Sequence, residues 1–472
     1  MNESHIGDRL RAIRLPATWV NARYYLVFVF TFLVLWCSPV TQLEDSRYSL
    51  LLSESILTRL TPDLSGYSIP EADPKTMPAV LDVAHLTPTY QLVYLNQKIL
   101  YYYPHGTSFL CLPFVALLRA AGISVTEPDG AYVQARERRE QLLLASLLMA
   151  AFTCLVLRTA EQMLPLSWSL LVALGATFGT QIWSSASRAL WSHSWEVVLG
   201  ALVILELLRS EKNGAVPRMA WVATILSWMF FVRPTGAVVA GAATIYMIVR
   251  YRERSFPLLL TGGCWLAAFV VYSEYTFGQS LPSYYRHDFH LTRNSLIAFA
   301  GNLISPSRGL FIFVPEIMFI AFMTARYWGV LRFRGLATLS IAIISAHLVV
   351  LTGDRIWYGG WSYGPRLATD LVPWFALLAV LSLDAFRGEA GDLRISRHLA
   401  GSQAGRRDRA IAIIGCLLLS LGVLINARGA LSSKTKAWNA APGLDERVWD
   451  WKDMQIFAGI GRHERDHARL PH

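Results

Sequence analysis

The sequence predicts an all-α polytopic membrane protein with about eleven transmembrane helices, the N-terminus in the cytoplasm and the C-terminus outside. Of its 472 residues, 54% are hydrophobic and only 16% are charged, whereas a soluble domain carries about a quarter charged residues. The apolar residues also gather into runs of about 16 to 20, a length that crosses a bilayer as a helix. Composition and clustering together therefore exclude an ordinary soluble enzyme.

The predicted spans follow one another along most of the chain, at residues 24–40, 141–157, 167–183, 190–208, 218–232, 235–250, 256–274, 310–325, 335–351, 367–384 and 410–426. The first run has no clear small-residue cleavage site, so we interpret it as a retained span and not as a signal peptide. Basic residues gather in alternate connections, and the positive-inside rule makes that side cytoplasmic. These residues are Arg209, Lys212, Arg218, Arg250, Arg252, Arg254, Arg326, Arg332 and Arg334.

One segment leaves the topology open. Residues 104–122, "PHGTSFLCLPFVALLRAAG", either cross the membrane or form a helix on its outer face. A crossing would change the sidedness of everything that follows, so we favour the outer-face helix. The predicted organisation is a transmembrane domain over residues 1–426, with a long first outer loop at 41–140, and an outer C-terminal tail at 427–472.

Several function classes are disfavoured. The net charge of +10 comes mainly from short basic clusters between apolar runs, as in cytoplasmic loops, and does not indicate nucleic-acid binding. The five cysteines show neither disulfide nor metal spacing. No P-loop and no G-x-G-x-x-G occurs, which disfavours direct use of a nucleotide-linked donor. Few charged residues appear deep within the predicted spans, which disfavours a transporter.

An acid pair, Glu44 and Asp45, opens the long outer loop directly after the first span. The following segment, residues 48–60, has the spacing of an amphipathic helix lying at the interface. A carboxylate held between a span and such a helix suits a general base. The same two residues would also suit a solvated helix start, because acidic side chains favour first turns.

Three arginines stand at the outer ends of spans. Arg233 precedes Pro234 in "VRPTG", while Arg308 and Arg366 stand beside Gly and Pro just before the chain re-enters the membrane. Arginine binds phosphate bidentately, and an unpaired guanidinium at such a position either meets an anion or extends to the interface. We predict that all three bind a lipid phosphate.

Aromatic and histidine side chains on the same face are candidates for sugar or acceptor binding. Flat rings suit sugar faces or acyl chains, although an aromatic belt at the interface and structural histidines would give the same pattern. The residues predicted for this role are Tyr102, Tyr103, His105, His193, Trp357, Trp361 and Tyr363.

These pieces together resemble the GT-C superfamily of membrane glycosyltransferases, which includes protein O-mannosyltransferases and aminoarabinose transferases of lipid A. The resemblance runs from Asp45 to the tail, most like a group of poorly characterised bacterial proteins. It is carried by "EDSRYSLLLSESIL", "YYYPHGTSFLCLPF", "LWSHSWE", "VRPTG", "FGQSLPSYY", "SPSRGLFIFVP", "GGWSYGPR" and "RVWDWKDMQ".

The resemblance implies an inverting transfer of a sugar from a polyprenyl-phosphate donor to a lipid, glycan or protein acceptor, outside the bacterial inner membrane. It implies catalysis by an acid in the first outer loop, where we favour Asp45 over Glu44, with Arg233, Arg308 and Arg366 on the lipid phosphate. Some relatives need a divalent cation, but without a further acidic cluster we expect no metal and no other cofactor. A lipid-linked glycan polymerase or ligase is the main alternative, and a lipid or sugar transporter the lesser one.

Overall fold

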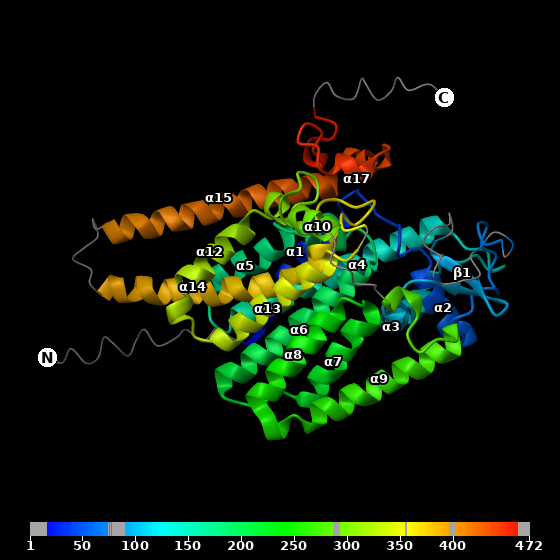
Figure 1. Cartoon of the computed structure of the whole chain (residues 1–472), viewed down its shortest axis with the longest axis horizontal. Helices are drawn as coiled ribbons and strands as arrows, with labels where there is room; N and C mark the ends of the chain where they lie inside the picture. The colour runs from blue at the N-terminus through cyan, green and yellow to red at the C-terminus, as the bar shows by residue number, and fades with distance from the viewer. Residues whose placement is uncertain are drawn as a thin grey trace.

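The computed structural model describes residues 17–73, 75, 77, 90–286, 293–354, 356–395 and 403–460. Within them the chain is a bundle of helices, many of them side by side, with one small hairpin at one end (Figure 1). The bundle helices are α1 (Ala17–Trp36), α4 (Gln134–Ala160), α5 (Leu166–Phe178), α6 (Ser192–Asn213), α7 (Met219–Val232), α8 (Gly236–Tyr251), α9 (Phe256–Phe277), α12 (Glu316–Arg326), α13 (Arg334–Leu351), α14 (Val372–Ile395) and α15 (Gln403–Leu431).

Every predicted span overlaps one of these helices, so the all-α fold class is confirmed. Five helical stretches in the described part are long and apolar enough to cross a membrane, namely Gln134–Ala160, Phe256–Phe277, Arg334–Leu351, Arg366–Gly388 and Arg406–Leu431. The stretch that starts at Arg366 joins a short 3-10 helix, Arg366–Leu371, to α14. The number of crossings and the orientation stay predictions.

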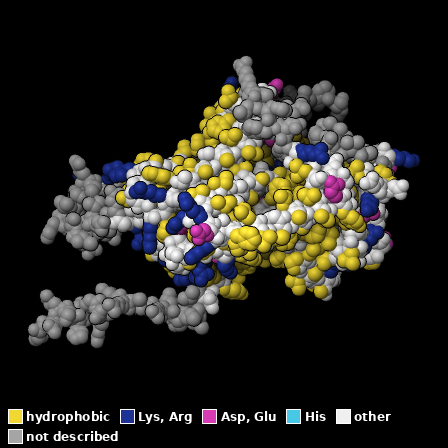
Figure 2. Space-filling view, turned by 60° about the horizontal axis from the view of Figure 1, so that its bottom comes forward, with side chains coloured by type: hydrophobic (Ala, Val, Ile, Leu, Met, Phe, Trp, Pro, Cys, Tyr) yellow, Lys and Arg dark blue, Asp and Glu magenta, His cyan; other side chains and the backbone are white. Residues whose placement is uncertain are grey.

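The surface agrees with a membrane environment. Apolar side chains cover much of the face in Figure 2, and Lys and Arg gather toward the end of the molecule on the left of that view. On α9, Phe256 and Val271 are 68% and 69% exposed, and on α15 Leu417 is 65% exposed. Large apolar side chains rarely face water in such numbers, so hydrocarbon is the natural solvent for these faces.

The described part of the predicted first outer loop, residues 41–140, folds at the opposite end of the bundle. It contains α2 (Ser49–Arg59), the strands β1 (Leu92–Leu95) and β2 (Lys98–Tyr101), and α3 (Gly106–Ala120). The strands pair antiparallel around Asn96 and Gln97, which both have positive φ angles (51° and 65°), the conformation of a two-residue hairpin turn. This hairpin was not predicted from the sequence.

The helix predicted within residues 48–60 is present as α2, and its position relative to the membrane stays a prediction. Residues Ser49–Ser55 of α2 are all buried, and the helix packs against α3 and α4. The carboxylate of Glu137 on α4 accepts hydrogen bonds from the backbone N–H groups of Tyr48 and Leu50, each at 2.9 Å. A carboxylate at these free N–H groups stabilises the helix start, so α2 is fixed to the bundle.

The C-terminal part of the described chain packs near Thr41 and Glu44, where Lys436 contacts both residues. After α15 it forms α16 (Ser433–Ala437) and α17 (Leu444–Arg447), which lie beyond the end of α15 in Figure 1. Two further short elements precede α12, namely α10 (Arg293–Ile304) and α11 (Leu310–Phe313). The predicted tail is therefore partly helical, and its last residues, 461–472, lie outside the described part.

Candidate active site

The segment that carries Glu44 and Asp45 is held in place by Arg188. This fully buried arginine donates to the carbonyl oxygens of Leu35 and Ser38, at 2.5 and 2.8 Å, at the end of α1. Its own carbonyl accepts a hydrogen bond from Gln42 N at 3.0 Å. Because the last carbonyls of a helix have no partners within the helix, a buried cation there both caps α1 and fixes the chain that follows.

The outer loop then fixes Asp45 from the other side. The hydroxyl of Tyr101, on β2, donates to the backbone oxygen of Asp45 at 2.6 Å. Burial raises the pKa of Tyr101 well above its ordinary value, so this hydroxyl keeps its proton and stays a donor. The hydrogen bond uses only the backbone of Asp45, which leaves the carboxylate free to face elsewhere.

The carboxylate of Asp45 forms an ion pair with Arg366. Asp45 Oδ2 lies 2.8 Å from Arg366 Nη1, although 321 residues separate the two in sequence. The guanidinium also stacks over the ring of Trp191, with 4.1 Å between its central carbon and the ring centroid. Nε of Arg366 is buried and has no hydrogen-bond partner in the described part of the chain. The N–H group of Nε is therefore a donor without an acceptor among the described residues.

Local sequence explains how Arg233 reaches the same place. Arg233 is the last residue before Pro234 and has extended backbone angles (φ −156°, ψ 132°), as expected for a residue before proline. It ends α7 and directs its side chain toward Asp370, whose Oδ2 lies 2.9 Å from Nε. Nη1 of Arg233 donates to Ser192 Oγ at 3.1 Å.

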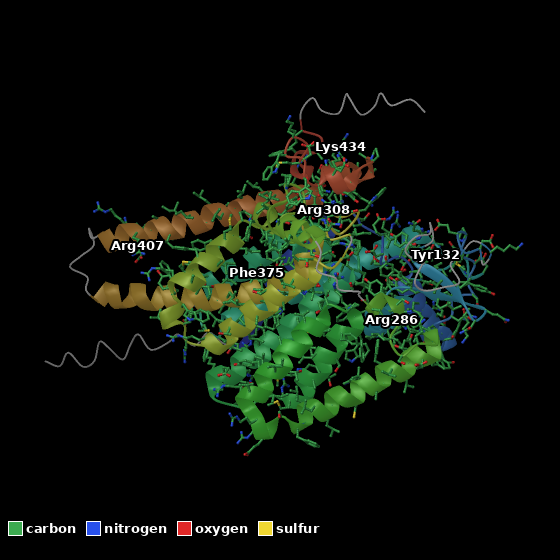
Figure 3. All side chains as sticks on the ribbon, in the orientation of Figure 1. Tyr132, Arg286, Arg308, Phe375, Arg407 and Lys434 are labelled. Atoms are coloured by element: carbon green, nitrogen blue, oxygen red, sulfur yellow. The ribbon has the colours of Figure 1, made fainter. Side chains whose placement is uncertain are left out.

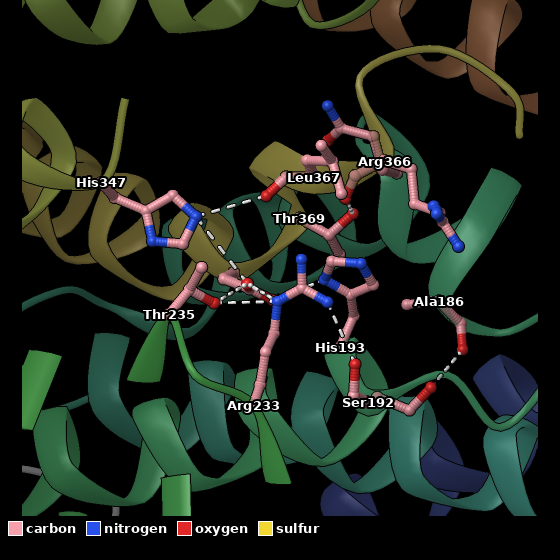
Figure 4. A network of polar contacts seen from close by, with 12 residues as sticks. Ala186, Ser192, His193, Arg233, Thr235, His347, Arg366, Leu367 and Thr369 are labelled. Carbon is pink, nitrogen blue, oxygen red and sulfur yellow. Dashed lines mark hydrogen bonds and ion pairs between the residues drawn. The ribbon is translucent and has the colours of Figure 1, made fainter. Parts of the chain in front are cut away.

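Asp370 lies directly behind Arg233, and it was not predicted from the sequence as a site residue. It accepts a hydrogen bond from His193 Nδ1 at 2.6 Å and lies 3.8 Å from His347 Nε2 (Figure 4). Its side chain is only 1% exposed. An acid inside an apolar span, one helical turn after Arg366, was the available signal, because an intramembrane ionisable residue is functional or paired by default.

The prediction that few charged residues lie deep within the spans is also wrong. Glu196 on α6 and Glu316 on α12 are buried like Asp370, and neither carboxyl group has a hydrogen-bond partner among the described residues. The shortage of intramembrane charge therefore no longer counts against a transporter.

Asp45, Arg366 and Arg233 line one small cavity of about 30 Å³. Its other walls include Ser192 and the ring of Tyr284. Three of the predicted residues, contributed by the first outer loop, the turn after α7 and the loop before α14, are thus brought together. The cavity combines an acid that can accept a proton with two cations that can bind an anion.

A second, larger cavity of about 260 Å³ adjoins the first and shares Tyr103 and Pro104 with it. Its walls are mostly aromatic and come from α3, α7 and α9, with Tyr102 and His105 at the outer-loop end. The ring of His105 is hydrogen-bonded to the hydroxyl of Tyr272, with 2.6 Å between Nδ1 and Oη. Burial lowers the pKa of His105 to about 4, so the ring is neutral at physiological pH.

Glu44 has a different setting from its neighbour. Its carboxylate lies 3.5 Å from Lys436 Nζ, in the C-terminal segment. Burial raises the pKa of Glu44, the ammonium group of Lys436 opposes this rise, and the adjacent Asp45 adds to it. Glu44 does not line the cavity that holds Arg233 and Arg366. The geometry therefore favours Asp45 over Glu44 as the acid at the site.

The structure does not bring Arg308 to this cavity, contrary to its predicted role at the lipid phosphate. Arg308 is buried beneath the C-terminal segment that carries Lys434 (Figure 3). Its guanidinium donates to Tyr358 O at 2.8 Å, to Gln455 Oε1 at 2.5 Å and to Asn439 Oδ1 at 2.8 Å. Burial lowers the pKa of Arg308 to about 9, which leaves it charged at neutral pH. Its hydrogen bonds connect the loop at Tyr358 to the C-terminal segment, which is a structural role.

Four other predicted binding residues also lie outside the walls of both cavities. Tyr363 is buried and donates from its hydroxyl to Ile425 O at 2.7 Å. Trp357 packs against Trp449, with ring centroids 5.9 Å apart, and Trp361 is 54% exposed. His193 lies behind Arg233, on Asp370. None of these four side chains therefore lines a cavity at the site. His193 instead contacts Asp370, which forms the ion pair with Arg233.

No group of three or more His, Cys, Asp and Glu side chains in the described ranges could hold a metal ion. The expectation that no metal or other cofactor takes part stays a prediction.

No protein-family model matches the sequence, and no curated protein matches it. Among solved structures, the chain is similar to ArnT from Cupriavidus metallidurans in the apo state, with a TM-score of 0.44 and 14% sequence identity. The match covers 93% of this chain and 75% of that chain. At this identity and TM-score the similarity gives no residue a role.

Proposed function

We propose that this chain is an inverting glycosyltransferase that moves a sugar from a polyprenyl-phosphate donor to an acceptor on the outer side of the membrane. One observation carries the proposal: Asp45, Arg366 and Arg233 line a single cavity, although they come from three distant parts of the chain. The motif resemblance and the apolar helices support the membrane setting. The acceptor is a lipid, a glycan or a protein hydroxyl or amine.

In the proposed reaction the two arginines bind the donor phosphate. Arg366 holds Asp45 through Nη1 and has Nε without a partner in the described part of the chain. Arg233 is fixed by Asp370 and Ser192 and faces the same cavity. Guanidinium groups bind phosphate oxygens with charge-assisted hydrogen bonds. Their positive charge would stabilise the negative charge that develops on the leaving phosphate.

Asp45 would act as the general base. As the acceptor oxygen or nitrogen forms its bond to the anomeric carbon, its proton passes to the carboxylate of Asp45. The bond from the anomeric carbon to the phosphate oxygen breaks on the opposite face, and the polyprenyl phosphate leaves with the electron pair. Attack in line with the leaving group inverts the anomeric configuration. The carboxylate is suitably placed because its backbone is fixed from both sides.

Donor binding would also change the site. A cavity of about 30 Å³ has room for a few water molecules, at about 10–15 Å³ of such space each, and this is less than a sugar ring needs. The side chains at its margin would have to move when the donor enters. The adjoining aromatic cavity of about 260 Å³ supplies apolar space next to the two arginines.

The experiment is a comparison of donors with the purified protein. We would offer a monosaccharide on polyprenyl monophosphate, an oligosaccharide on polyprenyl pyrophosphate and a nucleotide sugar, and measure the released lipid phosphate and the anomeric configuration of the product. The proposal expects turnover of the monophosphate donor alone, with inversion. Turnover of the pyrophosphate-linked oligosaccharide alone would replace it by a polymerase or ligase. Donor movement across liposomes without any turnover would replace it by a transporter.

A further inference from the structure

A separate cavity of about 150 Å³ lies within the bundle, between α5, α12, α14 and α15. None of its wall residues lines the cavity that holds Asp45 and Arg366. Figure 1 shows α15 at the edge of the bundle, and it packs against α12 and α5. The cavity walls include Trp168, Phe319 and Leu419. Apolar cavities of about this size stay free of water and bind apolar molecules.

One wall residue does not fit an apolar cavity. Glu316, the first residue of α12, is 8% exposed, and neither of its carboxyl oxygens has a hydrogen-bond partner in another residue of the described part of the chain. Burying such a group without a partner costs a few kcal/mol or more. The described cavity wall contains no Lys, Arg or His that could pair with it.

The fold makes room for this carboxyl group. A methyl group added to Gly179 would lie 2.3 Å from Glu316 Oε1, and one added to Gly422 would lie 2.3 Å from Oε2. Both distances are far shorter than any normal contact, so the carboxyl group occupies space that only glycine leaves on each side. Glu316 is therefore accommodated by α15 and by the end of α5.

The other polar groups of the cavity do not supply the missing donor. Thr180 donates to Ala176 O at 2.6 Å, and Ser382 donates to Leu378 O at 2.8 Å, each within its own helix region. The side of the bundle near α15 is open to lipid, since Cys416 in the cavity wall is exposed. A molecule from the hydrocarbon phase can therefore reach Glu316 with a donor group.

We propose that this cavity binds a membrane-soluble amphiphile with a hydrocarbon chain and an uncharged hydroxyl group that donates to Glu316. The hydrocarbon chain matches the apolar walls, and the hydroxyl donates to the Glu316 carboxyl group, which has no partner in another described residue. A hydroxyl can hydrogen-bond to a carboxylate and to a carboxylic acid alike, whereas an ammonium group suits only the carboxylate. The site is independent of the proposed glycosyl transfer.

The test uses binding and not activity. The purified full-length protein is irradiated with a twelve-carbon alcohol that carries a diazirine and an alkyne, and the labelled peptides are identified by mass spectrometry. Dodecan-1-ol and dodecyl methyl ether serve as competitors, because they share a chain and differ in the hydroxyl donor. One hydrogen bond of about 1–1.5 kcal/mol corresponds to roughly five- to tenfold in affinity. We therefore expect the alcohol to compete at about five- to tenfold lower concentration than the ether, with labels on α12 and α15.

Matched variants separate the carboxyl group from the cavity. Glu316→Gln keeps an acceptor oxygen and should keep the preference for the alcohol, whereas Glu316→Leu should remove the preference. Cys416→Phe should block the opening of the cavity at this exposed position and abolish labelling, while the neighbouring Leu417→Phe, at a position outside the cavity wall, should not.

Equal competition by alcohol and ether in the wild-type protein would overturn the proposal, as would labelling that survives Cys416→Phe. Stronger competition by dodecylamine, lost in Glu316→Gln, would show that the occupant is a cation and would also overturn it. Because the two substitutions lie on different helices, failure of one variant to fold leaves the other as a test.

Discussion

Replacing Asp370 by Asn is the sharpest perturbation of the charge network behind the site. Asn has almost the same shape but no charge, so the change removes the ion pair to Arg233 Nε, now at 2.9 Å, without opening a cavity. The amide group can keep one hydrogen bond to His193. If it does so through its oxygen, its NH₂ group faces the N–H of Arg233, which is also a donor.

The expected loss in the free energy of unfolding follows from the burial of Asp370 and Arg233. Asp370 is 1% and Arg233 11% exposed, and breaking a buried pair by removing one partner costs about 3–5 kcal/mol. Since Arg233 faces a cavity and keeps Ser192 as a partner, we expect a loss of about 3 kcal/mol, at the lower end of that range. Much of this loss reflects an unpaired guanidinium, so Arg233→Met added to Asp370→Asn should restore about 2 kcal/mol.

The assay is reversible unfolding in mixed micelles with increasing dodecyl sulfate, followed by tryptophan fluorescence for the wild type, both single variants and the double variant. A strongly non-additive double-variant cycle is the expected result. Two results would refute the reasoning: an Asp370→Asn variant as stable as the wild type, or a double variant that loses the sum of the two single losses.

Three further outcomes follow from the site and its surroundings. Arg366→Lys keeps the charge beside Asp45 but loses the planar donor group, so glycosyl transfer should fall at least tenfold while the protein stays folded. Arg308→Met removes the hydrogen bonds that Arg308 donates to the C-terminal segment. Trypsin should therefore cleave faster near Lys434 and Lys436, with little effect on polyprenyl phosphate binding. His105 is neutral in the folded protein because burial lowers its pKa to about 4. Unfolded histidine binds a proton below about pH 6.5, so stability should fall by up to about 3 kcal/mol as the pH drops from 6.5 to 4, and His105→Gln should remove that slope.

A different result would contradict each of these three predictions. Full transfer activity of Arg366→Lys would mean that a point charge suffices at the phosphate. Unchanged digestion of Arg308→Met would show that its hydrogen bonds do not hold the C-terminal segment. For the pH series, the same slope in His105→Gln as in the wild type would assign the acid sensitivity to another group. Size-exclusion profiles of all variants provide the common control for folding.

The sequence was sufficient for the fold class and for three residues of the site. Apolar runs of helical length predict the bundle, because in hydrocarbon only intra-segment hydrogen bonds satisfy the backbone. Asp45, Arg233 and Arg366 could be proposed together because each stands at the predicted outer end of a span. Their contacts with one another, at 321 residues' separation for Asp45 and Arg366, needed the structure.

Arg308 shows why the same local pattern can mislead. Like Arg366 it stands beside glycine before an apolar run, and nothing nearby in the sequence distinguishes the two. The difference comes from Gln455 and Asn439, which reach Arg308 from the C-terminal segment. Such distant acceptors give no local signal.

The hairpin after Leu92 was missed because its strands have only four residues each.

Asp370 was missed for a different reason. It lies within an apolar predicted span, so its own residue type is its only local signal. Its partners Arg233, His193 and His347 come from three other segments, which the sequence alone does not bring together.

The most direct test of the proposed chemistry compares two adjacent acids. Asp45→Asn removes the base that lines the cavity, whereas Glu44→Gln changes the neighbouring acid, which faces Lys436 and lies outside the cavity wall. Both are measured for sugar transfer from a polyprenyl monophosphate donor, after size-exclusion profiles confirm folding. General-base catalysis contributes typically 10²–10⁴-fold, so we predict that Asp45→Asn loses at least about a hundredfold in rate while Glu44→Gln stays within about threefold of the wild type. An Asp45→Asn variant as active as the wild type would contradict the assignment of Asp45 as the catalytic base.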